Sequence, residues 1–303
     1  MAHEFAYVNW KIVPVAGATV SEHDRSFLYG DGAFDTAVVR QNCVFKLDAH
    51  LERLRRSLLV LKIPPPLPHA ELREVALDLL RRNGVVDGFI RIVVSRGTCA
   101  WVSLDPRVVT GPPTLVMLTR AADPPREIAT THGRGSGVRA VTASVRKTPV
   151  ASLESRVKSN NYLNNILARW EAIEAGVDEA ILLDARGYVT EGTGDNVFAV
   201  CRGRLVTPPP LNILEGITRE TILALAPRAP IEADVRDLTP YDLYTADEVF
   251  LTSTVVGVMP IVELDGRVIG TGARGPVGRR LQALYDEVLV TEGMPIAWGK
   301  AGP

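Results

Sequence analysis

A segment rich in proline and glycine interrupts the chain near its middle, and it limits the possible folds more than any other feature. Between Ala121 and Ser136 the periodic patterns stop, and prolines and glycines gather at Pro124, Pro125, Gly133, Gly135 and Gly137. Such composition is typical of a linker between domains. The chain has 303 residues, which is enough for two domains of about 150 residues each. We therefore expect an N-terminal domain over 1–120, a linker over 121–136 and a larger C-terminal domain over 137–303.

The N-terminal half predicts strands around two helices. Two hairpins are expected, the second around the turn pair Gln41-Asn42, with strands over Phe5–Asn9, Lys11–Val15, Phe34–Arg40 and Cys43–Leu47. Leucines recur on one face of a segment that runs from Asp48, a candidate N-cap, to Lys62. A second helix is predicted over Ala70–Asn83, with Gly84 as its C-terminal cap.

The C-terminal half mixes strands and helices without an internal repeat. Strands are predicted over Val138–Ser144, Glu179–Asp184, Asn196–Val200 and Glu248–Leu251. Helices are predicted over Asn161–Ala175, Ile217–Ala226 and Gly278–Glu292. The pair Asp265-Gly266 predicts a further hairpin. The two halves together indicate an α+β architecture of two domains, with the functional cleft expected between them.

The charge composition argues against one large class of proteins. The chain has 34 basic and 35 acidic residues and a net charge of −1, unlike proteins that bind nucleic acids or anionic membranes by bulk electrostatics. The sequence shows no leader pattern at its start, and three scattered cysteines indicate neither a disulfide framework nor a metal cluster. The histidines lack ligand spacing, so no metal is expected. We expect a soluble, cytoplasmic enzyme.

Lysine chemistry has few candidates, because only six of the 34 basic residues are lysines: Lys11, Lys46, Lys62, Lys147, Lys158 and Lys300. Most of them, including Lys147 at a predicted exposed strand end, are expected to be surface cations. Lys158 differs because it precedes Ser159-Asn160-Asn161, which is expected to cap the helix that follows. The positive end of a helix dipole favours the neutral amine that Schiff-base chemistry requires.

Four further motifs are candidates for binding a cofactor. Glu191 opens a glycine-rich turn before an apolar strand, where a carboxylate suits a pyridine nitrogen. The segment Leu214–Arg219 opens a helix and suits a phosphate. The hydroxyls of Thr252-Ser253-Thr254 form a second candidate cradle, and Arg53 suits a bidentate phosphate contact. Each motif alone also has an ordinary explanation, as a turn, an N-cap, a polar strand end or a solvated helix face.

Taken in chain order, these residues resemble the cofactor site of the fold-type IV pyridoxal-phosphate enzymes: Arg53, Lys158, Glu191, Gly216-Ile217-Thr218 and Thr254. This group comprises the branched-chain-amino-acid aminotransferases, the D-amino acid aminotransferases, the (R)-selective amine transaminases and the aminodeoxychorismate lyases. The resemblance runs over nearly the whole chain. Its most specific parts are the segment from Asn161 to Ala168 after Lys158, the turn from Glu191 to Asn196, and Gly216-Ile217-Thr218-Arg219.

The resemblance implies a role for each of these positions. Lys158 would form a Schiff base with pyridoxal 5′-phosphate and then move a proton as general acid and base. Glu191 would pair with the pyridine nitrogen, and Tyr162 would bond the phenolic oxygen of the ring. The phosphate would be held by Arg53, by the backbone of Ile217 and Thr218, and by Thr254, and the further cofactor-binding residues would be Gly216 and Ser253.

The substrate pocket is only partly matched. Positions similar to the side-chain and carboxylate pocket of the branched-chain group are Tyr29, Phe34, Phe89, Arg91 and Val255. The group's usual arginine after its Phe-Glu-Gly-Ile segment is replaced by Val38, and Arg40 stands in a different register. The turn that continues through Val256 is bulkier than in the group. Trp101 is equally consistent with a residue that closes over the substrate and with interface packing.

These departures leave more than one activity open. We expect an aminotransferase that exchanges an amino group between a branched-chain amino acid and a 2-oxo acid. The alternatives are a D-amino acid or (R)-amine transaminase, an aminodeoxychorismate lyase, and a non-enzymatic module. The resemblance also implies a homodimer or a higher homo-oligomer, with no nucleic-acid or membrane partner.

Overall fold

The structure is a computed structural model that describes residues 4–121 and 137–296. It divides into two compact units. The N-terminal unit comprises the described parts of Met1–Asp123, Val157–Asn161 and Leu289–Pro303, and the C-terminal unit comprises those of Pro124–Arg156 and Tyr162–Val288. Apart from Ala121, the predicted linker lies outside the described residues.

The boundaries of the units differ from the predicted domains in two places. The sequence assigns Val157–Asn161 and the C-terminal segment to the second domain, but the structure groups both with the N-terminal unit. Backbone hydrogen bonds explain the difference, because the N–H of Phe34 donates to the carbonyl of Lys158 at 2.9 Å and the last strand, β16 (Gly293–Pro295), pairs with β4 (Cys43–Phe45). Such pairing between distant segments leaves no local sequence signal.

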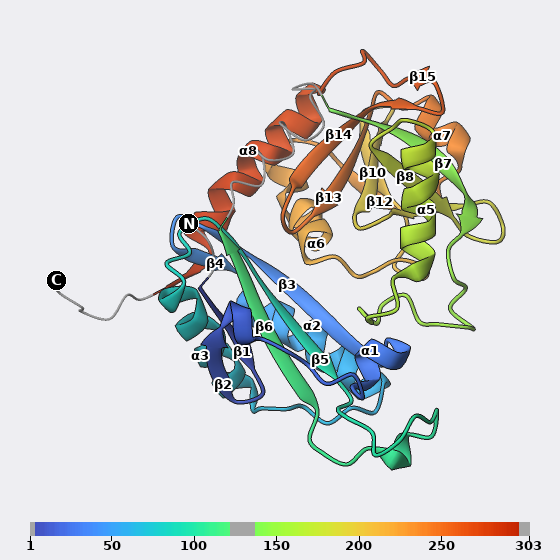
Figure 1. The fold of residues 1–303 in the computed structure, drawn as a ribbon. Coiled ribbons are helices and arrows are strands. Elements are labelled where there is room, and N and C mark those ends of the chain that lie inside the picture. Colours follow the sequence, from blue (N-terminus) through green and yellow to red (C-terminus); the bar gives the residue numbers. More distant parts are fainter. Residues whose placement is uncertain (1–3, 122–136, 297–303) are drawn as a thin grey trace. The chain divides into compact units, whose positions relative to one another are not determined.

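Among the described residues, the N-terminal unit contains a seven-stranded sheet in the order β16-β4-β3-β5-β6-β1-β2, and Figure 1 shows its strands. Each described pairing is antiparallel. The remaining strands are β1 (Phe5–Val8), β2 (Lys11–Pro14), β3 (Gly32–Arg40), β5 (Gly88–Ser95) and β6 (Thr114–Ala121). Both predicted hairpins form, and Gln41 and Asn42 adopt φ values of 48° and 61°, as a tight two-residue turn requires.

Two long helices and one short helix complete this unit: α1 (Arg25–Tyr29), α2 (Leu47–Val60) and α3 (His69–Arg82). Helix α2 packs on β3, and α3 packs on β1 and β6. The leucines of α2 enter the core as expected. Asp48 is not the N-cap; it lies in the first turn, and Lys46 is the N-cap with φ of 47°. Helix α1 is too short to give a periodic pattern, so the sequence did not predict it.

The described strands of the C-terminal unit form a nine-stranded sheet in the order β12-β11-β10-β13-β14-β7-β8-β9, with β15 beside β14. Strand β9 also pairs with β10. A closed ring is therefore formed by β10, β13, β14, β7, β8 and β9. Figure 1 labels several of these strands. Bounds are β7 (Val138–Arg146), β8 (Glu179–Leu183), β9 (Val189–Gly192), β10 (Asn196–Cys201), β11 (Arg204–Thr207), β12 (Ala233–Val235), β13 (Glu248–Ser253), β14 (Gly257–Leu264) and β15 (Arg267–Val268).

Helices cover parts of this sheet and flank it: α5 (Leu163–Glu174), α6 (Ile217–Leu225), α7 (Pro240–Tyr244) and α8 (Pro276–Thr291). Helix α5 packs on β7 and β8 through small residues such as Ala168 and Ala172, both fully buried. The short 3-10 helices are η1 (Val15–Gly17), η2 (Pro106–Val108) and η3 (Ala226–Arg228). Within the described ranges, no helix combines the length and the apolar character that a membrane span requires.

Candidate active site

Three buried polar residues lie in register on neighbouring strands of the C-terminal unit. Glu191 on β9 faces Asn196 on β10, and Asn196 in turn pairs with Thr252 on β13. The two oxygens of the Glu191 carboxylate are both engaged, because Lys147 Nζ lies 2.5 Å from Oε1 and the backbone N–H of Leu214 donates to Oε2 at 2.9 Å. The predicted acidic residue is therefore held in place and charge-compensated by this unit's own groups.

Lys147 differs from its predicted role as a surface cation. Its side chain is buried, and its backbone N–H donates to the carbonyl of Leu183 at 2.8 Å. Lys147 directly follows β7, and its hydrogen bond to Leu183 connects the end of β7 to β8. Burial of an ammonium group requires a partner, and Glu191 supplies it.

The N-terminus of α6 lies beside the same carboxylate. Gly216 is the N-cap of this helix, and within the described residues no side chain caps it, so its first backbone N–H groups are available to an anion. A Cβ on Gly216 would stand 1.9 Å from Oδ1 of Asn196, which explains why glycine occupies this position. The motif Gly216-Ile217-Thr218 and Glu191 are thus brought together through Asn196, which donates to the carbonyl of Leu214 at 3.0 Å.

Hydroxyl groups border this cluster. Thr252 Oγ1 is buried and has no hydrogen-bond partner in the described part of the chain, although a buried hydroxyl normally finds one. Ser253 ends β13, and Thr254 begins the turn to β14. Thr218 Oγ1 lies 3.3 Å from the hydroxyl of Tyr285. The predicted hydroxyl cradle therefore adjoins Asn196 on the strand next to it.

Lys158 belongs to the N-terminal unit. Its backbone N–H donates to Ser57 Oγ at 3.2 Å, and its Nζ lies 4.8 Å from the centre of the Phe34 ring. The predicted cap for α5 does not form: the helix begins after Tyr162, which makes no side-chain cap. The Asn160 and Asn161 side chains instead donate to Ser26 Oγ and the Gly30 carbonyl. A helix dipole acts mainly on groups near the first turn of the helix. The dipole of α5 therefore does not explain why Lys158 differs from the other lysines.

Arg53 takes part in a fully buried charged network. Its guanidinium donates to the Asp35 carboxylate from Nε and Nη2, both at 2.8 Å, and His50 Nδ1 lies 2.7 Å from Asp35 Oδ1. Although burial alone would raise the pKa of Asp35, the charges of Arg53 and His50 hold it far below its usual range. Burial lowers the pKa of His50, against the opposing effect of Asp35. The Asp35 carboxylate therefore holds the Arg53 guanidinium in place independently of any bound phosphate.

One face of the N-terminal sheet gathers several residues of the predicted substrate pocket. Phe34 and Val38 alternate along β3, and Val38 pairs with Phe89 on β5. Arg91 lies in register with Thr36, and its guanidinium carbon stands 4.7 Å from the Phe34 ring centre. Ala33, Ala37 and Val39 on the opposite face enter the core. Lys158 and this partly apolar face therefore meet at Phe34.

The remaining predicted pocket residues come from other positions in the fold. Arg40 ends β3 and forms an ion pair with Asp87 at 3.4 Å. Tyr29 ends α1, with the Arg25 guanidinium carbon 5.0 Å from its ring centre. Trp101 is 61% exposed, in the loop before η2. Val255 and Val256 form the turn between β13 and β14.

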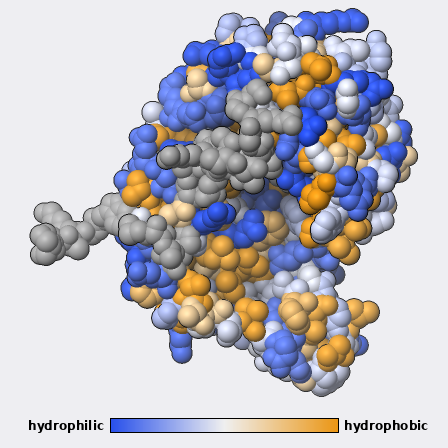
Figure 2. Space-filling model, turned by 45° about the horizontal axis from the view of Figure 1, so that its top comes forward, coloured by the Kyte–Doolittle hydropathy of each residue, from blue (hydrophilic) through white to orange (hydrophobic). Residues whose placement is uncertain are grey.

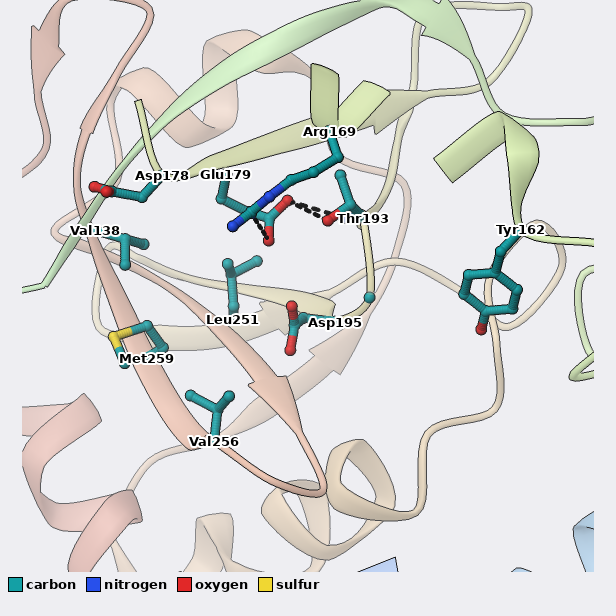
Figure 3. A pocket seen from close by; sticks show the side chains of 11 residues that line it. Val138, Tyr162, Arg169, Asp178, Glu179, Thr193, Asp195, Leu251, Val256 and Met259 are labelled. Carbon is teal, nitrogen blue, oxygen red and sulfur yellow. Dashed lines mark hydrogen bonds and ion pairs between the residues drawn. The ribbon is translucent and has the colours of Figure 1, made fainter. Parts of the chain in front are cut away.

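Tyr162 lines a cavity of about 350 Å³ within the C-terminal unit (Figure 3). In this view Tyr162 lies to one side, apart from a polar group in which Glu179 accepts hydrogen bonds from Arg169 at 2.9 Å and from Thr193 Oγ1 at 2.6 Å. Val256 and Asp195 line the same cavity. The helix that Tyr162 precedes is tied to the glycine-rich turn, because Asn165 donates to the carbonyl of Thr193 at 2.8 Å.

Four residues of these clusters are not predicted as functional from the sequence. Asp35, His50 and Asn196 are buried polar groups that fix Arg53 and Gly216, and Lys147 compensates Glu191. The sequence does indicate one of them, Asp35. It is a lone carboxylate in an apolar strand, and a buried charge requires a partner.

The donor set fits pyridoxal 5′-phosphate. The C-terminal unit offers a buried carboxylate for a pyridine nitrogen, uncapped helix N–H groups for a phosphate, and the Thr252 hydroxyl, which has no partner among the described residues. The N-terminal unit offers the Lys158 amine and the Arg53 guanidinium, linked through Ser57, which bonds Lys158 N–H and the carbonyl of Arg53. These are the groups that an aldehyde cofactor with a phosphate and a basic ring nitrogen requires.

Comparison with known proteins agrees with this chemistry. The family model for amino-transferase class IV matches residues 32–264. A putative branched-chain-amino-acid aminotransferase of Methanocaldococcus jannaschii is 42% identical over 96% of this chain and 98% of its own.

Two solved structures are similar over the same extent. The branched-chain aminotransferase of Thermoproteus uzoniensis, solved with norvaline, has a TM-score of 0.86 and 32% identity, covering 95% of this chain and 95% of that one. The branched-chain amino acid aminotransferase of Thermobaculum terrenum, solved in its PLP-form, has a TM-score of 0.82 and 29% identity, covering 94% of each chain.

These similarities decide several of the predictions. The fold-type IV architecture, the pyridoxal-phosphate cofactor and the aminotransferase activity are confirmed. With a family model that spans most of its length and a relative aligned almost from end to end, this chain belongs to the class IV aminotransferases.

Proposed function

We propose that the protein transfers an amino group between a branched-chain amino acid and a 2-oxo acid, with Lys158 as its catalytic residue. The observation that carries the substrate class is that Phe34 and Phe89 are partly exposed on one face of the sheet, with the Lys158 amine 4.8 Å from the Phe34 ring centre. An aliphatic side chain is favoured on such a surface because its burial removes apolar area from water.

Bound pyridoxal 5′-phosphate supplies an aldehyde that condenses with amines and a ring that accepts electrons. The chain's own residues do the rest. Glu191 accepts a hydrogen bond from the ring nitrogen and keeps it protonated. Tyr162 bonds the phenolic oxygen. Ile217, Thr218 and the adjoining hydroxyls bind the phosphate.

Lys158 has two duties in this proposal. In the absence of substrate, its amine would hold the aldehyde carbon of the cofactor. With substrate bound, the same amine would accept the proton from the substrate α-carbon and return it as general acid. Its backbone is held on both sides, by Phe34 N–H and Ser57 Oγ, so the side chain can move while its anchor stays fixed.

The attachment point is tested by borohydride reduction of the holoenzyme followed by peptide mapping. We expect the pyridoxyl label on Lys158 and an unlabelled Lys147, whose ammonium is engaged by Glu191 at 2.5 Å. A Lys158→Ala variant is the matched control and should carry no label. A label on Lys147 in the unaltered protein would overturn the assignment of Lys158.

The donor is tested by a half-reaction on purified holoenzyme. L-leucine, D-alanine and (R)-1-phenylethylamine are added separately, and loss of the absorbance of protein-bound pyridoxal phosphate is followed. We expect fast bleaching by L-leucine alone. Bleaching by D-alanine or the (R)-amine would indicate that Val38 and the turn at Val255-Val256 have redirected the site, and bleaching by none of the three would contradict the proposed donor.

We further propose a cytoplasmic homodimer. Apolar side chains on α5 that are about half exposed or more recur with helical spacing, at Leu163, Ile166, Leu167, Trp170 and Ile173. Figure 2 shows apolar patches between hydrophilic residues on the face it draws. A row of this kind on one helix is typical of a subunit interface. Cys43, Cys99 and Cys201 carry free thiols, as cytoplasmic proteins do.

A further inference from the structure

The ion pair between Lys147 and Glu191 joins the end of one strand to another strand of the same sheet. Lys147 follows β7, while Glu191 lies on β9. The other described donors to the carboxylate are the N–H of Leu214, which precedes α6, and Asn196 Nδ2 on β10 at the long distance of 3.5 Å. Lys147 is therefore the donor that brings a full positive charge to this carboxylate.

The cations on the neighbouring elements are directed elsewhere. Arg146, at the end of β7, donates to the carbonyl of Ala143 at 2.9 Å. Arg219 on α6 donates to Thr207 Oγ1 at 3.2 Å and to the carbonyl of Pro208 at 2.8 Å. Neither contact reaches Glu191, so the compensation of its charge rests on Lys147.

A carboxylate oxygen can accept two hydrogen bonds. Leu214 and Asn196 both donate to Oε2, whereas Lys147 donates to Oε1, so Oε1 keeps room for one further donor. A buried carboxylate without a cation takes up a proton instead of keeping its charge. It would then present an O–H to a ring nitrogen rather than a charged acceptor.

We propose that Lys147 is a positioning residue that keeps Glu191 ionised and aimed before the cofactor arrives. The inference rests on the proposed function, in which Glu191 receives the ring nitrogen of pyridoxal 5′-phosphate. Lys147 itself touches neither cofactor nor substrate in this proposal. It acts through Glu191, so that the acceptor is ready when the cofactor binds and no proton has to leave the site first.

The test compares binding of pyridoxal 5′-phosphate to unaltered protein, Lys147→Met and Lys147→Arg between pH 6 and pH 8.5. We expect Lys147→Met to bind about tenfold more weakly at neutral pH. The ratio of its dissociation constant to that of the unaltered protein should fall as pH rises, because the lone carboxylate ionises at high pH. Lys147→Arg should restore most of the affinity. A ratio that does not change with pH, or no rescue by arginine, would overturn the proposal.

A second measurement needs no cofactor. Thermal unfolding of apoprotein is compared among Lys147→Met, Glu191→Gln and the double variant. Because Lys147→Met leaves the Glu191 carboxyl group buried without its partner, a cost that the double variant avoids, we expect Lys147→Met to lower the melting temperature more than the double variant does. Equal or additive losses would show that the two side chains do not interact. Failure of the unaltered protein to bind pyridoxal 5′-phosphate would refute the proposed function, whereas normal binding by Lys147→Met would refute this inference alone.

Discussion

The buried network around Asp35 allows a prediction with a definite magnitude. Replacing Asp35 with asparagine keeps the shape of the side chain but removes its charge. Asp35 is 1% exposed and Arg53 is 4% exposed, and four hydrogen bonds of 2.7 to 2.8 Å converge on the carboxylate, from His50, twice from Arg53 and from the backbone N–H of Thr36. Breaking a buried ion pair by removing one partner costs about 3–5 kcal/mol. Asparagine retains one acceptor oxygen, so we expect a loss near the lower end of that range, about 3 kcal/mol.

The assay is urea unfolding of the apoprotein at pH 7, followed by circular dichroism. Glu52→Gln is the matched control, because Glu52 lies on α2 beside Arg53 and its ion pair with Arg55 is close to half exposed on both sides. Exposed pairs of this kind contribute about 0.2–1 kcal/mol. If Asp35→Asn lost no more than Glu52→Gln, the argument that burial makes the Asp35 network strong would be wrong.

Three further predictions follow from other features. Gly216→Ala should weaken binding of pyridoxal 5′-phosphate at least about tenfold in a titration, since its Cβ would stand 1.9 Å from Asn196 Oδ1; unchanged affinity would contradict the proposed cradle. The pKa of His50 is lowered in the folded protein, so the unfolded chain binds more protons below about pH 6.5. The free energy of unfolding should therefore fall as the pH is lowered from about 6.5 to 5. His50→Asn should reduce this dependence on pH. Ile166→Asp combined with Trp170→Asp should convert the dimer to monomers in sedimentation; a dimer that persisted would place the interface elsewhere.

Much of the fold could be predicted from local patterns. The turn pairs Gln41-Asn42 and Asp265-Gly266 both adopt positive φ values, and the apolar face of α2 enters the core as its leucine spacing indicates. Helix α1 is too short for its period to be visible. The edge pairing of β16 with β4 and the closure of β9 on β10 depend on tertiary context, so local sequence carries no sign of them.

The candidate site was predictable in its residue types but not in its partners. Glu191 and Gly216 stand out as an acidic residue and a glycine in turns, but their link through Asn196 appears only in the strand register. Lys147 was misjudged because a lysine at a strand end is usually solvated, whereas here it is buried against Glu191. Burial is a tertiary property, and a linear pattern reports it only for apolar faces.

The pairing of β16 with β4 has a consequence for how the chain folds during its synthesis. Strand β4 is among the first to be synthesised and β16 is the last of the described strands, and Ser159, which bridges to Ala33, is made midway. During synthesis, domains generally fold as units, beginning with the N-terminal one. This order fails here, because the N-terminal unit receives β16 only after the described strands of the C-terminal unit have been synthesised. Until then the edge of β4 has no neighbour, and an exposed strand edge is a site for unwanted pairing. In the nascent chain, the free edge of β4 therefore stays open to unwanted pairing for as long as the C-terminal unit is being synthesised.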